Sequence, residues 1–153
     1  MHLLTRQRSK TESEVSEMRY QLERQVGFVL RKTVQRHLMI FTRLMGEDLT
    51  PTQFAAMAKL YESGPCSQNR LGRLTAMDAA TIKGVIDRLG NRGLTRVEPH
   101  ANDARLQMVH LTGAGRKLVR TAIPRAVRIT DDTLKPLTRE ERGQLLRLLQ
   151  KLS

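Results

Sequence analysis

A long amphipathic stretch near the start of the chain constrains the fold more than any other feature. Apolar residues recur at three- and four-residue steps from residue 11 to residue 46, which predicts one long helix. Gly27 is its weak point and is expected to mark a bend. A small domain cannot easily cover so long an apolar stripe, so we expect a partner chain beside it. The stripe comprises Val15, Met18, Leu22, Val26, Leu30, Val34, His37, Leu38, Phe41 and Leu44.

Composition narrows the class of protein. The chain has 153 residues and a formal net charge of +12, with 20 Arg among its 27 basic residues. This charge predicts a polyanionic partner, with nucleic acid ahead of an anionic membrane surface. A lone cysteine, Cys66, excludes a disulfide framework and a cysteine zinc finger. No apolar run approaches a membrane span, and the first ten residues lack the apolar core of a signal peptide, so we expect a cytoplasmic protein.

Capping motifs divide the middle of the chain into helices. Thr50-Pro51-Thr52-Gln53 predicts a helix start, and Ser63-Gly64-Pro65 predicts its end. Ser67 can cap a short helix with Leu71 and Leu74 buried, and Asp78 can cap another that ends at Gly93. The buried face of this later helix is predicted to comprise Ile82, Val85, Ile86 and Leu89.

The pattern then changes to that of strands. Residues 94–98 and 106–111 are rich in β-forming residues and flank a polar turn over 99–105, which predicts a hairpin. Thr112 can cap a helix over about 113–131, which Pro124 should kink or break. A second capping box at Thr138 opens a helix whose apolar positions are Leu145, Leu146, Leu148, Leu149 and Leu152.

Residues 67–92 have the spacing of a helix-turn-helix motif, with Thr75-Ala76-Met77 as the tight turn. With the hairpin that follows, the fold class is mainly α with a small β-hairpin wing. In such a fold the second helix enters the major groove of DNA. Thr81 and Lys83 can then contact base edges or phosphates, and Ala80 can contact a thymine methyl group.

An ordered set of motifs resembles the MarR family of transcription regulators. The set runs from Leu49-Thr50-Pro51-Thr52-Gln53-Phe54 through Asp87-Arg88-Leu89 and Arg92-Gly93-Leu94 to Asp103-Ala104-Arg105 and Gly115. The resemblance implies a homodimeric winged-helix repressor that binds a palindromic operator in double-stranded DNA and is released by a small molecule. It also implies dimerisation helices over 1–48 and 113–153, with the DNA-binding domain over 49–112.

The resemblance assigns roles in the wing, where Asp103 is expected to orient Arg105 for insertion into the minor groove. This chain departs from the family in the recognition helix, where many members have a Ser/Thr-Arg pair in place of Lys83-Gly84. It also has Ala101 where a proline is frequent. The predicted DNA-binding residues are Ser67, Gln68, Arg70, Ala80, Thr81, Lys83, Arg88, Asp103 and Arg105.

An effector site is expected between the dimerisation helices and the winged helix. An aromatic carboxylate would need a cation and apolar walls, and Arg31, His37, Phe41 and Phe54 are the candidates. A core or interface position for His37 is the alternative. No nucleophile–base set, phosphate loop or metal-ligand spacing predicts an enzyme, a cofactor or a metal site. Two other functions stay open, a non-specific architectural nucleic-acid binder and a redox-sensing regulator acting through Cys66.

Overall fold

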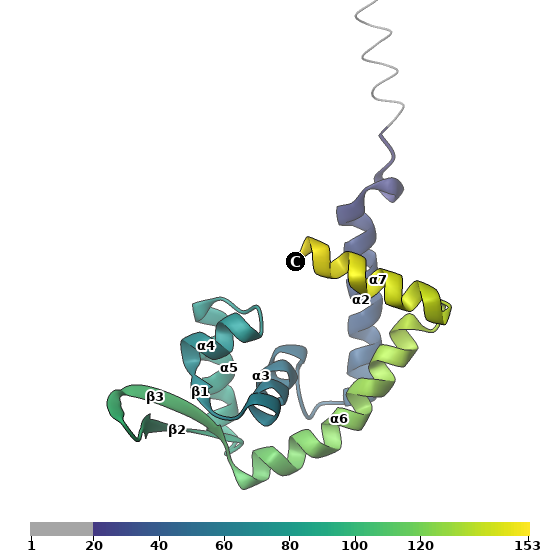
Figure 1. Ribbon diagram of the computed structural model, residues 1–153. Helices are drawn as coiled ribbons and strands as arrows, with labels where there is room; N and C mark the ends of the chain where they lie inside the picture. The colour runs from purple at the N-terminus through teal and green to yellow at the C-terminus, as the bar shows by residue number, and fades with distance from the viewer. Residues whose placement is uncertain (1–19) are drawn as a thin grey trace, which may run out of the picture. The chain divides into compact units, whose positions relative to one another are not determined.

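The structure is a computed structural model that describes residues 20–153 (Figure 1). These residues belong to two units, residues 20–38 and residues 39–153. Val15 and Met18 of the predicted apolar stripe lie outside the described residues. None of the helices within residues 20–153 contains an apolar stretch that could span a lipid bilayer.

Within the described residues, the long N-terminal helix begins later than predicted. A single 3-10 turn, η1 (Leu22–Arg24), precedes helix α2 (Val26–Met45), which continues into the second unit. The predicted unbroken helix through residues 20–25 is wrong, because Gln25 has an extended backbone with φ −83° and ψ 130°. The apolar side chains here, Leu22 and Val26, are 48% and 67% exposed. Without packing on an apolar face, a short helical segment is not stable in water.

The predicted capping motifs begin the helices of the second unit. At the start of α3 (Pro51–Ser63), the Thr50 hydroxyl accepts a hydrogen bond from the Gln53 N–H, and the Gln53 side chain accepts one from the Thr50 N–H. Helix α4 (Gln68–Leu74) is capped by Ser67, and helix α5 (Ala79–Asn91) is capped by Asp78. These local motifs were correctly predicted because each depends on a few neighbouring residues.

The core of the second unit includes the whole predicted apolar face of α5. Leu74 is the exception among the predicted core positions, since it is 42% exposed. It is the last residue of a seven-residue helix, and Leu71, one turn earlier, is fully buried in its place. The largest fully buried side chains are those of Met45, Met57, Leu71, Ile82, Val85, Leu89, Val109 and Val119.

The sheet has three antiparallel strands in the order β1-β3-β2. They are β1 (Cys66–Ser67), β2 (Thr95–His100) and β3 (Asp103–Leu111). The predicted hairpin is confirmed, but the predicted turn over 99–105 is too long, because His100 already pairs with Asp103. Strand β1 was not predicted, since two residues are too few to show a period. Figure 1 shows β2 and β3 projecting from the helices of this unit.

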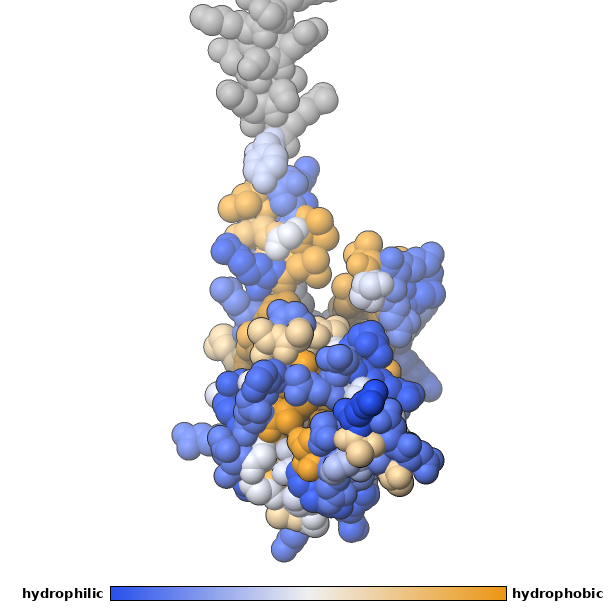
Figure 2. Space-filling model, turned by 90° about the vertical axis from the view of Figure 1, so that its left-hand side faces the viewer, coloured by the Kyte–Doolittle hydropathy of each residue, from blue (hydrophilic) through white to orange (hydrophobic). Residues whose placement is uncertain are grey.

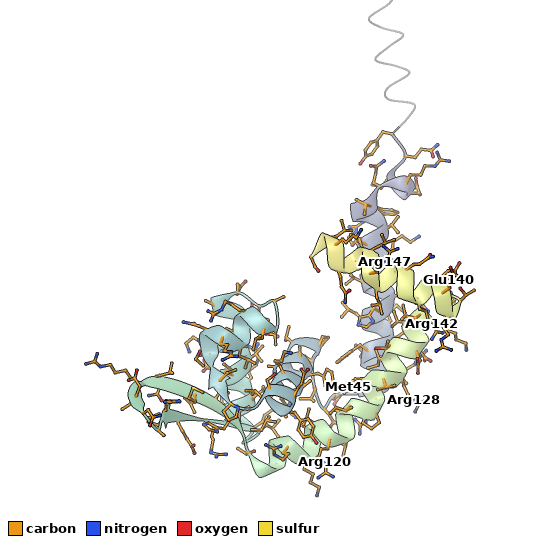
Figure 3. All side chains as sticks on the ribbon, in the orientation of Figure 1. Met45, Arg120, Arg128, Glu140, Arg142 and Arg147 are labelled. Atoms are coloured by element: carbon orange, nitrogen blue, oxygen red, sulfur yellow. The ribbon has the colours of Figure 1, made fainter. Side chains whose placement is uncertain are left out.

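Two C-terminal helices complete the chain, α6 (Gly113–Leu134) and α7 (Arg139–Leu152). Of the kink or break predicted at Pro124, the break is wrong, because α6 continues through the proline; Figure 1 shows the helix curving along its length. Burial of Val119, Ala122 and Ile129 supports the helix on both sides of the proline. Arg125 also donates hydrogen bonds to the Met45 carbonyl and the Asp48 carboxylate; Figure 3 shows Met45 beside α6.

Candidate nucleic-acid interface

The turn between α4 and α5 is tight enough to fix the angle between the two helices. Ala76 adopts a left-handed backbone with φ 53°, and the Met77 N–H donates to the Gly72 carbonyl at 2.9 Å. A Cβ at Gly72 would lie 3.1 Å from the Met77 carbonyl oxygen and 3.2 Å from Cγ2 of Ile82. The close approach of α4 to α5 therefore depends on the missing side chain at Gly72.

Helix α5 presents a polar face opposite its buried residues. Ala80 and Lys83 are exposed and Thr81 is half-buried, so all three predicted contact residues are accessible. Lys83 donates to the Asp87 carboxylate at 2.7 Å, one turn further along the helix. This pairing neutralises Asp87, whose negative charge would otherwise repel a phosphate backbone.

The predicted DNA-contact residues at the start of α4 differ in their exposure to solvent. Arg70 is exposed, whereas Ser67 and Gln68 are half-buried. The Ser67 hydroxyl accepts a hydrogen bond from the Arg70 N–H at 3.3 Å, so this side chain caps α4. Ser67 therefore has a structural role at this helix start, and Gln68 and Arg70 are the other two predicted contact residues of this segment.

The wing differs from its expected geometry in one contact. The Asp103 carboxylate accepts a hydrogen bond from the backbone N–H of Arg105 at 3.0 Å. In the described part of the chain, no ion pair joins Asp103 to the guanidinium of Arg105. On the other side of the turn, the Asn102 N–H donates to Nδ1 of His100 at 3.2 Å. The side chains of Asp103 and His100 therefore stabilise the backbone of the wing tip. The Arg105 side chain is exposed.

Cys66 lies in β1, where it pairs with Val109, and its side chain is buried in the core. Burial raises the pKa of its thiol, and this effect is larger than the opposing effect of Arg70. A raised pKa lowers the fraction of reactive thiolate at neutral pH. These properties are typical of a structural cysteine.

The predicted effector residues lie in two groups. In the second unit, the rings of Phe41 and Phe54 meet edge to face with centroids 6.5 Å apart, and Phe41 is buried. In the first unit, His37 is half-buried, and Arg31 is exposed with its guanidinium carbon 5.6 Å from the centre of the Phe28 ring. The effector site predicted from the sequence draws on both units and stays a prediction.

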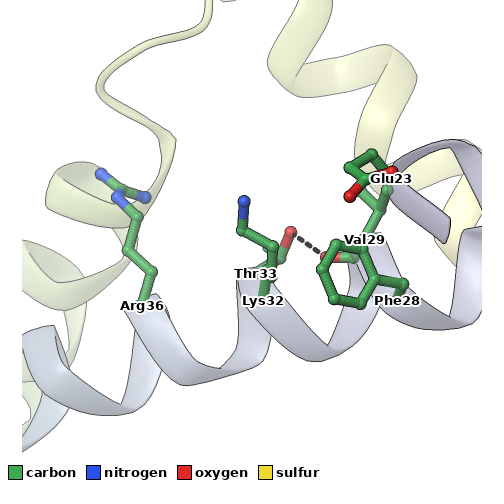
Figure 4. A pocket seen from close by; sticks show the side chains of 6 residues that line it. All are labelled: Glu23, Phe28, Val29, Lys32, Thr33 and Arg36. Atoms are coloured by element: carbon green, nitrogen blue, oxygen red, sulfur yellow. Dashed lines mark hydrogen bonds between the residues drawn. The ribbon is translucent and has the colours of Figure 1, made fainter.

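A hollow of about 350 Å³ lies along the first unit (Figure 4). Phe28, Lys32 and Arg36 follow one another at four-residue steps, which places them on one face of α2. Sequence reasoning missed these three residues, although their spacing could have identified them. The Lys32 ammonium lies 5.7 Å from the centre of the Phe28 ring, so the hollow combines an aromatic wall with a cation. It is lined by Glu23, Phe28, Val29, Lys32, Thr33 and Arg36.

A second hollow, of about 600 Å³, lies at the start of α6. Arg116, Lys117 and Arg120 line it, and Arg120 is labelled on α6 in Figure 3. The guanidinium of Arg116 also lies 5.6 Å from the centre of the Tyr61 ring. These cations belong to residues 113–153, which carry 10 basic and 4 acidic side chains. They make the surface of α6 attractive to a polyanion.

Comparison with known proteins agrees with this geometry. The model of the MarR family matches residues 49–106, which include the helix-turn-helix motif and most of the wing. The HTH-type transcriptional repressor NicR of Pseudomonas putida is 39% identical over 134 residues, covering 87% of this chain and 85% of NicR. The chain belongs to the MarR family. It is therefore a transcription regulator, and its relatives in this family are named as transcription regulators too.

Two solved structures show the same fold over most of the chain. A probable transcriptional regulator from Pseudomonas aeruginosa superimposes with a TM-score of 0.84 at 46% identity, covering 87% of this chain and all of that one. BpsR of Bordetella bronchiseptica gives a TM-score of 0.84 at 39% identity, covering 87% of this chain and 96% of BpsR. The DNA binding of BpsR is regulated by 6-hydroxynicotinic acid. The predicted winged-helix fold of the MarR family is thereby confirmed.

Proposed function

We propose that the chain works as a homodimeric repressor, which binds a pseudo-palindromic operator and leaves it when a small aromatic carboxylate binds. One observation supports DNA binding above all others. Helix α5 has an exposed polar face, and the wing beside it has an exposed Arg105 at its tip. Two such motifs, about 34–36 Å apart in a dimer, enter successive major grooves on one face of the duplex. Repression is supported by the 39% identity to NicR, a named repressor.

The exposed apolar faces of two helices support the dimer. On α2, Val26 and Val34 are more than half exposed, and Figure 2 shows hydrophobic side chains (orange) on the column below the grey and pale-blue atoms. On α7 no residue is buried, and Leu148 and Leu152 are 50% and 74% exposed. Apolar surfaces of this kind are typical of protein–protein interfaces.

Light scattering tests the dimer directly. Wild-type protein is expected to have twice the mass of one chain, and the double variant Leu148→Glu/Leu149→Glu should shift towards the monomer. The matched control is Gln144→Glu, which adds a charge to the same helix at a polar position. A monomeric wild type, or a double variant that dimerises as well as the control, contradicts the proposed interface.

The hollow on α2 supports an aromatic carboxylate as the effector. Phe28 offers a ring face, and Lys32 and Arg36 offer positive charge to a carboxylate. The regulation of BpsR by 6-hydroxynicotinic acid makes this compound the first candidate. Arg31, His37, Phe41 and Phe54 remain the effector residues proposed from the sequence. An effector can release the operator only through its different affinity for the two states of the dimer.

A DNA-release assay tests the effector. The probe is the duplex that wild-type protein enriches from a library of random duplexes, called the selected operator below. We expect 6-hydroxynicotinic acid to dissociate the complex and acetate at the same concentration to leave it intact. Lys32→Gln should raise the required concentration about tenfold, the effect of one charge-assisted contact, with affinity for the selected operator unchanged. Lys135→Gln is the control; no release of wild type by 6-hydroxynicotinic acid contradicts the proposed effector.

A further inference from the structure

Gly84 is an unexpected residue in the middle of α5. It is the sixth of the thirteen residues of the helix, where glycine is the poorest residue apart from proline. Its backbone is not in the left-handed region that favours glycine, unlike Gly46, Gly64 and Gly93. The conformation of the chain at residue 84 therefore gives no reason for a missing side chain.

The reason lies one turn further along the helix. A Cβ at Gly84 would lie 3.2 Å and 3.4 Å from the two terminal nitrogens of Arg88, and 3.6 Å from the carbon between them. The guanidinium of Arg88 thus lies against the backbone of residue 84, and a Cβ there would push it aside by a few tenths of an ångström. Long side chains in a helix lean towards its N-terminus, and four residues correspond to about 6 Å along the axis.

This position puts the guanidinium in the centre of the exposed face. At about 100° per residue, Gly84 and Ala80 lie opposite the buried residues of α5, with Arg88 to one side. By leaning over Gly84, Arg88 places its guanidinium at the middle of the face and directs it towards the N-terminal part of the helix. In helix-turn-helix proteins that part of the recognition helix contacts base edges.

Arg88 and Lys83, the two cations of α5, differ in whether they form an ion pair. Lys83 is paired with Asp87 at 2.7 Å. Among the described residues, Arg88 takes part in no ion pair. The planar guanidinium of arginine can donate two parallel hydrogen bonds to the O6 and N7 acceptors of guanine. A lysine ammonium is a point charge and lacks this geometry.

We propose that Arg88 recognises a guanine in the major groove of each half-site, and that Gly84 determines this specificity by leaving room for the guanidinium. The proposal rests on the proposed DNA binding. It assigns the specificity of α5 to a pair of residues four positions apart, Gly84 as the positioning residue and Arg88 as the contact.

Selection from a library of random duplexes tests the pair against matched controls. Wild type is expected to enrich a symmetric motif with one guanine in each half-site that depends on Arg88. Arg88→Ala should lose the preference for that base pair alone, with about a ten- to hundredfold loss of affinity per half-site. Gly84→Ala should displace the guanidinium and lose between about twofold and tenfold. Gly90→Ala is the control in the same helix, because a Cβ there meets only Oγ1 of Thr95, at 4.0 Å.

Two further measurements separate positioning from folding and from direct contact. Both glycine-to-alanine variants should melt at or above the wild-type temperature, since alanine favours the helix, so a loss of affinity in Gly84→Ala alone is not a loss of fold. In an Arg88→Ala background, Gly84→Ala should change affinity by less than about twofold. A loss that persists in this background means that residue 84 itself approaches DNA, which overturns the proposal.

Two results distinguish a wrong role for Arg88 from a wrong proposed function. If Arg88→Ala lowers affinity equally for all duplexes and leaves the enriched motif unchanged, Arg88 contacts phosphate and the inference is wrong, although the regulator still binds its operator. If wild type enriches no motif, both the proposed operator and the inference are wrong.

Discussion

The Asp103 carboxylate accepts a hydrogen bond from the backbone N–H of Arg105 at 3.0 Å, so it stabilises the backbone conformation of the wing tip. A side-chain oxygen that accepts from an N–H two residues later stabilises a turn, and an asparagine can do the same. The guanidinium of Arg105 extends from this turn into solvent. The structure therefore gives Asp103 a role that depends on its oxygen atom more than on its charge.

Substitutions in the wing distinguish these roles. Arg105→Ala should weaken binding to the selected operator about tenfold or more, the size of one lost base contact, while the protein stays dimeric. Asp103→Asn keeps the acceptor and should retain most of the affinity, whereas Asp103→Ala should approach the loss of Arg105→Ala. Anisotropy titrations at constant salt measure all three. If the asparagine variant is as weak as the alanine variant, the carboxylate charge is what matters.

Gly115 should tolerate no side chain. A Cβ there would overlap the carbonyl oxygen and carbon of Leu94, which are backbone atoms that cannot move aside. Gly115→Ala is expected to lower the free energy of unfolding by about 1–3 kcal/mol or more, as overpacking does. The control is Gly113→Ala in the same helix, where nothing lies within 4 Å of the added Cβ. Urea titrations compare them, and equal stability of the two variants would contradict this packing.

Acid should weaken the start of α5. The Thr81 N–H donates to the Asp78 carboxylate at 2.7 Å, and this hydrogen bond lowers the pKa of Asp78 below its ordinary value. A lowered pKa in the folded state means that the stabilisation is present above the ordinary pKa and is lost as the pH falls through the folded value. Asp78→Asn keeps the cap without titrating. Melting temperatures should therefore favour wild type near pH 6, and the difference should shrink below about pH 4. A difference that is the same at pH 3 and pH 6 contradicts this origin.

Cys66 should have no part in regulation. Its thiol is buried and its pKa is raised by burial, so little thiolate is exposed to an oxidant. Hydrogen peroxide is expected to leave operator affinity unchanged in wild type and in Cys66→Ala. A thiol reagent should label the native protein far more slowly than the protein in urea. Loss of affinity on oxidation in wild type, absent from Cys66→Ala, would support the redox-sensing alternative.

The parts predicted well from the sequence are those with local causes. The capping residues Thr50, Ser67, Asp78 and Thr138 begin their helices as predicted, because a cap involves only the first turn. The four buried residues of α5 follow from a period of 3.6 residues. The start of α2 at Val26 could not be predicted in this way, because the period continues across Gln25 while the packing that would sustain a helix does not.

The parts that were missed depend on contacts between distant segments. Strand β1 exists because Cys66 pairs with Val109, and the length of the wing depends on the pairing of His100 with Asp103. The resemblance to the MarR family included Gly115, but only the position of the Leu94 carbonyl explains it. Gly84 was a departure from the family pattern without a physical account, and the position of Arg88 supplies one.

Competition between specific and random DNA tests the central claim most directly. The labelled selected operator is bound to wild-type protein at about 150 mM salt, and unlabelled selected or random duplex of the same length is added. A sequence-specific regulator should prefer its operator by roughly a thousandfold or more. If random duplex competes as well as the operator, and binding falls away almost completely as salt is raised, the chain is a non-specific nucleic-acid binder. That result would contradict sequence-specific recognition of an operator.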